Sequence, residues 1–268
     1  LNTPYPATAY LKGFLNTLKI TSHQADLGIE TILALFSSKG LQQMFAHLET
    51  LDLQLSENAY RIYTLQQNYI KTIDPVIRFL QNKNSTLAHS ICDRTYLPEA
   101  SRFAQLEDLE WAFGTMGIQD KARHLATLYL EDLGDLITEA IDPYFGFSRY
   151  AERLGRTATH FDELQQSLLA PNSIITDVLV DLLKQKIEKY KPTVVCLSVP
   201  FPGNLFGALK CGQFIKNAYP HIKVVLGGGY ANTELRSLND PRVFDFIDYV
   251  SLDDGEAPIK YLTEYLEG

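Results

Sequence analysis

Four short segments of the sequence carry residues that suit ligand binding, and each follows a run of residues predicted to form a strand. They are Thr3-Pro4-Tyr5-Pro6, Ser198-Val199-Pro200-Phe201-Pro202-Gly203-Asn204, Gly227-Gly228-Gly229-Tyr230 and Asp253-Asp254-Gly255-Glu256. Three consecutive glycines let a backbone approach a large flat ligand, because no side chain stands in the way. Gly, Pro, Asn and Asp also form ordinary turns, so the glycines taken alone favour a ligand-binding loop and a merely structural loop equally.

The acidic residues of the fourth segment have two interpretations. Asp253, Asp254 and Glu256 are oxygen ligands that suit a metal ion, but carboxylates also favour the N-terminus of a helix. A solvated loop that caps the following helix is the commoner outcome, and we prefer it.

Other kinds of catalytic site lack their motifs in this sequence. The six histidines include no pair spaced i, i+4 for a metal, and Ser198 has no Gly-x-Ser-x-Gly motif around it. Neither the phosphate-binding nor the dinucleotide-binding glycine motif occurs. Cys92, Cys196 and Cys211 have no zinc or iron–sulfur spacing, and Cys196 lies in an apolar run that predicts an inert core thiol.

Strands and helices alternate at both ends of the sequence, and they place the four segments. The predicted strands cover residues 1–3, 19–26, 193–199, 222–226 and 246–250. The predicted helices beside them cover residues 7–18, 172–191, 205–218, 233–238 and 258–266. A continuous β-branched run such as 193–199 is typical of a strand that is buried on both faces. The predicted fold class is therefore α/β, with a doubly wound, flavodoxin-like or Rossmann-like parallel sheet of five strands.

The middle of the chain is predicted to be entirely helical. Apolar residues recur every three or four positions between Leu51 and Ile73, as on one face of a long helix that Pro75 interrupts or kinks. We interpret such stripes as core packing. Residues 29–171 are thus predicted to be a helical insertion, and residues 1–28 and 172–268 to form the α/β domain.

Composition limits the class of protein. The chain has 268 residues, of which 46% are hydrophobic, so it can fill a core. Its formal net charge of −8 argues against binding to nucleic acid, and it has no apolar run long enough to span a membrane. The three cysteines are odd in number and have no metal-binding spacing, which predicts reduced thiols and a cytoplasmic location.

The order of the four segments resembles the cobalamin (vitamin B12)-binding domain that precedes the catalytic barrel in cobalamin-dependent radical S-adenosylmethionine enzymes. The resemblance covers residues 1–28 and about 172–262. Asn2-Thr3-Pro4-Tyr5-Pro6-Ala7 is similar to the Pro-containing loop after the family's first strand, and Val195-Cys196-Leu197-Ser198 is similar to its Val-Gly-Leu-Ser pattern. Residues 222–228 resemble its fourth strand and Gly-Gly pair, and residues 248–256 resemble Asp-x-Val-x-x-Gly-Glu-Gly-Glu.

The resemblance implies where a cobalamin would bind. The loops at Ser198 and at Gly227–Gly229 would cradle the nucleotide tail and the corrin edge, and the loop at Thr3–Pro6 would face the ring. Tyr5, Phe201 and Tyr230 would cover it. The implied cofactor-binding residues are Thr3, Pro4, Tyr5, Ser198, Val199, Pro200, Gly227, Gly228, Gly229, Tyr230, Asp254, Gly255 and Glu256.

Three departures from the family limit what this chain does. The loop after the first strand has no histidine, the first being His23, so cobalamin is expected to bind without a histidine lower ligand. Asp253 and Asp254 replace the first Gly-Glu of the last motif. The chain has no Cys-x-x-x-Cys-x-x-Cys motif, so a [4Fe-4S] cluster and S-adenosylmethionine are expected only in a barrel beyond Gly268.

Two functions remain open. The first is the cobalamin-binding part of a radical S-adenosylmethionine enzyme, for example a methyltransferase, whose partner is the downstream barrel of the same chain. The missing initiator Met and the strand-like opening favour this interpretation, since both suggest a portion of a longer chain. The second is a non-catalytic flavodoxin-like module, which binds another ligand or a protein and no cobalamin.

Overall fold

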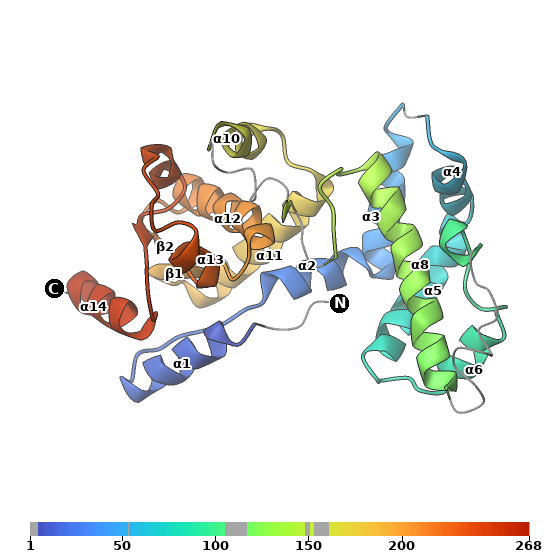
Figure 1. The fold of residues 1–268 in the computed structure, drawn as a ribbon, viewed down its shortest axis with the longest axis horizontal. Coiled ribbons are helices and arrows are strands. Elements are labelled where there is room, and N and C mark those ends of the chain that lie inside the picture. The colour runs from blue at the N-terminus through green and yellow to red at the C-terminus, as the bar shows by residue number, and fades with distance from the viewer. Residues whose placement is uncertain (1–4, 53, 105–116, 148–150, 153–160, 268) are drawn as a thin grey trace. The chain divides into compact units, whose positions relative to one another are not determined.

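The computed structural model describes residues 5–52, 54–104, 117–147, 151–152 and 161–267 (Figure 1). The chain divides into two compact units. Residues Leu1–Thr31 and Gly146–Gly268 form the first, which we call the sheet unit, and Ile32–Phe145 form the second, the helical unit. Helix α2 (Leu27–Leu35) contains the point of division. Among the described residues, no helix has the length and apolar character needed to cross a bilayer.

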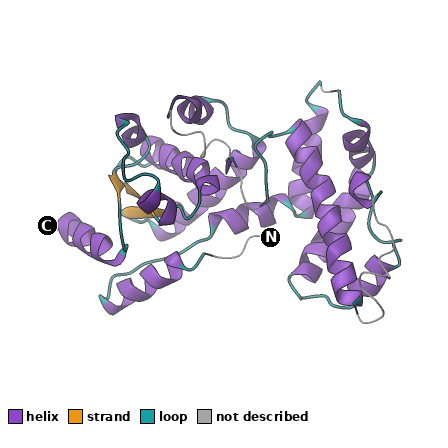
Figure 2. Ribbon diagram, viewed as in Figure 1, coloured by secondary structure: helices purple, strands orange, loops and turns teal. Residues whose placement is uncertain are grey.

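The described part of the sheet unit contains three parallel strands in the order β1-β2-β3. Strands are orange in Figure 2. They are β1 (Val194–Ser198), β2 (Lys223–Gly227) and β3 (Tyr249–Val250). The register pairs Leu197 with Leu226, and Leu226 with Val250. The α/β class and the three C-terminal strands are thus confirmed, with β3 shorter than predicted.

The other two predicted strands have different outcomes. Residues 1–3 lie outside the described residues. Residues 20–26 form a loop and not the predicted edge strand, because their backbone groups bond elsewhere. The N–H of Ile20 donates to the carbonyl of Leu15 at 3.0 Å, which closes α1 (Ala7–Thr17), and Lys12 Nζ donates to the carbonyl of Ser22 at 2.9 Å.

Among the described residues of the sheet unit there are seven further helices. They are α10 (Phe161–Leu169), α11 (Ile174–Tyr190), η2 (Pro202–Asn204), α12 (Leu205–Ala218), α13 (Gly229–Thr233), η3 (Pro241–Asp245) and α14 (Glu256–Glu267). Ser173 caps α11, since its hydroxyl accepts the N–H of Thr176.

One face of the sheet packs on the core of this unit. Val224 and Leu226 of β2 are completely buried among apolar side chains of α10, α11 and α12. Cys196 lies between the core-facing Val195 and Leu197, so it points to the opposite face, where it is exposed. The predicted burial of both faces of β1 is therefore wrong at Cys196, which lies outside the core.

The described residues of the helical unit form helices and the loops between them, with no strand. The helices that follow α2 are α3 (Ser38–Glu49), α4 (Glu57–Thr64), α5 (Gln66–Leu80), α6 (Leu87–Cys92), η1 (Ser101–Phe103) and α8 (Ile118–Ala140). The single long helix predicted through residues 51–73 is wrong. Ser56 starts a helix by accepting the N–H of Ala59, and the backbone turns at Leu65 between α4 and α5. Pro75 lies inside α5, which continues past it.

Packing explains why α5 tolerates the proline. Tyr69, Ile73 and Val76 on this helix are completely buried. The rings of Tyr69 and Tyr129 stack with centroids 5.1 Å apart, and the Tyr129 hydroxyl donates to the carbonyl of Tyr69 at 3.1 Å. Such burial offsets the roughly 3 kcal/mol that a proline costs inside a helix. The interpretation of these stripes as core packing is confirmed.

Candidate ligand-binding site

The loops that follow β1 and β2 are joined by backbone hydrogen bonds at the carboxyl edge of the sheet. The N–H of Val199 donates to the carbonyl of Gly227 at 2.7 Å, and the N–H of Tyr230 donates to the carbonyl of Val199 at 3.0 Å. The carboxyl edge of a parallel sheet is where ligands of such folds bind. Two of the four sequence segments therefore lie side by side at this edge.

Gly228 allows the two loops to meet. Its φ of +103° and ψ of 178° belong to a conformation that is essentially restricted to glycine. A Cβ at this position would stand 2.7 Å from the nitrogen and 2.8 Å from the oxygen of Val199. Gly228 is thus required for the fold of the edge itself, because the main chain of Val199 occupies the space where a Cβ would stand.

The neighbouring glycines face other partners. A Cβ on Gly227 would stand 3.3 Å from Cβ of Ser251, in the loop after β3. A Cβ on Gly229 would stand 3.4 Å from the carbonyl of Pro200 and 3.9 Å from the hydroxyl of Tyr5. The first three segments therefore meet at this edge through Tyr5, Pro200 and Gly229, whereas Thr3 and Pro4 lie outside the described residues.

Two aromatic rings stand at this edge. Tyr5 and Phe201 are in edge-to-face contact, with ring centroids 5.9 Å apart and an interplanar angle of 76°. They are 44% and 61% exposed, so a substantial part of each residue's surface is available to a ligand. Tyr230 differs from them, because it packs against the core and burial raises the pKa of its hydroxyl.

Ser198 has an unusual environment at the end of β1. Its hydroxyl oxygen is buried and has no hydrogen-bond partner among the described residues. A buried polar atom in this state costs about 1–3 kcal/mol. A ligand with a polar atom at the carboxyl edge would recover that free energy.

The fourth segment is tied to α13 by polar contacts. Asp253 has a φ of 62°, in the left-handed region, at the position where the resembled motif has Gly. Arg236 forms an ion pair with the Asp253 carboxylate, and the side-chain oxygen of Asn232 accepts the N–H of Asp253 at 3.0 Å. The contacts with Asn232 and Arg236 thus compensate for Asp253 in place of the glycine of the motif. The sequence analysis did not identify these two residues, although their i, i+4 spacing is a signal that could have found them.

The rest of the fourth segment lies beside α1. Leu11 Cδ2 would be 3.0 Å from a Cβ on Gly255, and Glu256 lines a surface groove with residues of α1 that include Tyr10. Asp254 is exposed. Asp253 is engaged with Arg236, and in the described part of the chain no three His, Cys, Asp or Glu side chains converge as a metal site.

Asp248, which the resembled motif contains, lies at the amino end of β3. Its carboxylate accepts the N–H of Val224 at 2.8 Å and pairs with Lys216 at 3.1 Å. Burial opposes ionisation, but these partners together hold the pKa of Asp248 below its ordinary value. The residue therefore fastens the amino ends of the strands, away from the candidate site.

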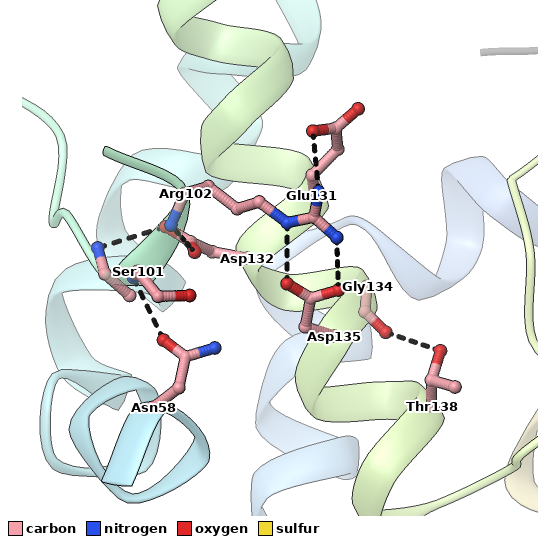
Figure 3. A network of polar contacts seen from close by, with 9 residues as sticks. Asn58, Ser101, Arg102, Glu131, Asp132, Gly134, Asp135 and Thr138 are labelled. Carbon is pink, nitrogen blue, oxygen red and sulfur yellow. Dashed lines mark hydrogen bonds and ion pairs between the residues drawn. The ribbon is translucent and has the colours of Figure 1, made fainter. Parts of the chain in front are cut away.

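The helical unit has a polar network of its own (Figure 3). Asp132, on α8, is completely buried and accepts the backbone N–H groups of Ala100 and Arg102, both at 3.0 Å. The Arg102 guanidinium makes two bonds of 2.7 Å to Asp135. Burial raises the pKa of Asp132, and its two backbone donors oppose this shift. Both carboxylate oxygens of Asp132 have partners, so the network serves to anchor η1 to α8.

The carboxyl edge thus offers bare backbone, two exposed rings and one buried hydroxyl, which suit a large ligand with flat and polar parts. Comparison with known proteins gave no match, whether to a protein-family model, a curated protein or a solved structure.

Proposed function

We propose that the sheet unit binds cobalamin, as the domain that precedes the catalytic barrel in cobalamin-dependent radical S-adenosylmethionine enzymes does. The observation that carries the proposal is the junction of Gly228 with Val199, which joins the triple-glycine loop to the loop that follows the partnerless hydroxyl of Ser198. Backbone without side chains fits the edge of a corrin ring, and the hydroxyl fits a polar atom of the nucleotide tail.

The residues at the carboxyl edge of the sheet would contact different parts of the cobalamin. Ser198 donates to or accepts from the nucleotide tail, and Gly227–Gly229 admit the corrin edge. Tyr5 and Phe201 would pack against the ring, and cobalamin would bind without a histidine lower ligand. Bound cobalamin supplies methyl transfer or supports radical chemistry, and the chain holds and shields it.

The five-stranded, doubly wound sheet is part of the same proposal. Its support among the described residues is Tyr5, which contacts Phe201, in the loop just after β1, and lies near Gly229. The [4Fe-4S] cluster and S-adenosylmethionine belong, in this proposal, to a barrel C-terminal to residue 268.

The test is direct binding of hydroxocobalamin to the full chain. We expect the folded protein to retain the red chromophore through gel filtration. Ser198→Ala removes the proposed hydrogen bond between this hydroxyl and cobalamin. Loss of that bond should cost about 1–1.5 kcal/mol of binding free energy, so the affinity should fall by roughly fivefold to tenfold. Ser22→Ala is the matched control, because Ser22 also has a buried hydroxyl without a partner among the described residues. Equal effects of the two variants would remove Ser198 from the site.

A second function is favoured by a different surface. Tyr261 and Tyr265 on α14 are 64% and 75% exposed, as on a helix that contacts a protein. A folded wild-type chain that retains no cobalamin would favour this non-catalytic interaction module over the proposed function.

A further inference from the structure

The loop that carries Phe201 has a constrained backbone and an exposed ring. Phe201 lies between Pro200 and Pro202, and its backbone is extended, with φ −140° and ψ 159°. Its carbonyl accepts the N–H of Asn204 at 3.0 Å, which starts η2. The ring therefore projects from a fixed backbone at the mouth of the candidate site.

Tyr5 meets this ring from the N-terminal side. The next residue, Pro6, is the N-cap of α1, and its carbonyl accepts the N–H groups of Ala9 and Tyr10 at 3.0 and 3.1 Å. The Tyr5 ring contacts Phe201 edge to face, and its hydroxyl lies near Gly229. Tyr5 thus stands at the approach to the bare backbone that the ligand needs.

We propose that Tyr5 is a gate for the ligand site: its ring leaves Phe201 to admit a large, flat, conjugated ring and then packs on that ring together with Phe201. The proposal rests on the proposed function, and it adds the side chain that controls entry and exit. A contact between two exposed rings is weak, so it can open, and both rings gain burial when a ligand lies between them.

The charges beside the site favour a ring over a phosphate group at this mouth. Arg236 lies just after α13, the helix that starts at Gly229, but its guanidinium is engaged with Asp253 and Asn232. The aromatic pair is therefore the feature that selects the ligand here, and a ligand is recognised through its flat faces.

The rates of hydroxocobalamin binding test the gate, measured by stopped-flow absorbance on the full chain. Tyr5→Ala should speed association about threefold or more and dissociation about tenfold, because a gate and its packing are both lost. Tyr5→Phe should stay within about twofold of wild type, since the ring remains. Tyr10→Ala is the matched control, because Tyr10 is 71% exposed on α1. Unchanged association in Tyr5→Ala would overturn the gate.

A second measurement does not depend on cobalamin. In protein labelled with ¹⁵N-glycine, Tyr5→Ala should shift the amide signal of Gly229, whereas Tyr10→Ala should leave it in place. If wild type binds no cobalamin, the proposed function fails, and a shifted Gly229 signal still supports Tyr5 at the mouth. An unshifted signal in a folded Tyr5→Ala variant would overturn the gate whether or not cobalamin binds.

Discussion

The backbone nitrogen of Val199 lies 2.7 Å from the point at which a Cβ on Gly228 would stand. Two loops that are nearly thirty residues apart in the sequence therefore interlock through their main chains. The contact explains why a glycine is required in the middle of the triple-glycine segment. It also makes the candidate site sensitive to single atoms added at this edge.

Gly228→Ala should destabilise the protein by about 2–4 kcal/mol, because the new methyl group clashes with Val199 and the residue keeps a strained φ. Urea unfolding measures the loss. Gly13→Ala is the control, since nothing lies within 4 Å of a Cβ on Gly13 in α1. That variant should be neutral or more stable by about 0.5–1 kcal/mol, as for Gly to Ala in a helix. A similar loss in both variants would contradict the steric explanation.

Asp253→Ala and Asp253→Gly should differ in stability although both remove the ion pair with Arg236. Alanine keeps the left-handed conformation at a cost of about 1–2 kcal/mol, whereas glycine adopts it freely. The exposed ion pair itself contributes only about 0–1 kcal/mol. Thermal unfolding should therefore rank glycine above alanine. The reverse order would show that the φ of 62° does not limit this loop.

Asp248 should make stability depend on pH in the acid range. Its pKa is lower in the folded protein than the ordinary value of 3.8. The unfolded chain therefore takes up this proton first as the pH falls, so the stabilisation is complete at neutral pH and is lost through the folded pKa. Asp248→Asn should reduce the slope of unfolding free energy against pH below about pH 4. An unchanged slope in Asp248→Asn would contradict this explanation.

Asp132→Asn should destabilise the helical unit by about 1–3 kcal/mol, because an amide offers one acceptor where two backbone N–H groups need one each. The measurement is chemical unfolding followed by far-ultraviolet circular dichroism. Asp135→Asn, in the more exposed pair with Arg102, should cost only about 0–1 kcal/mol. Equal costs would show that the buried backbone bonds are not what anchors η1.

The parts of the fold that the sequence predicts well are those with long apolar patterns. The strand at Val194–Ser198 and the strand at Lys223–Gly227 both come from short apolar runs that contain adjacent valines, a pattern typical of strands in a parallel sheet. The predicted edge strand at residues 19–26 fails because its alternation is short and polar. Its backbone groups serve instead to close α1 and to bond Lys12.

The sequence by itself determined the α/β class, the helical middle and the glycine-rich loops, because these depend on local patterns of hydrophobicity and turn residues. Only the tertiary structure decided which loops meet. The pairing of Gly228 with Val199, the contact of Tyr5 with Phe201 and the exposure of Cys196 all depend on segments distant in sequence. Such contacts form when apolar surfaces are buried together, and no local pattern in the sequence encodes them.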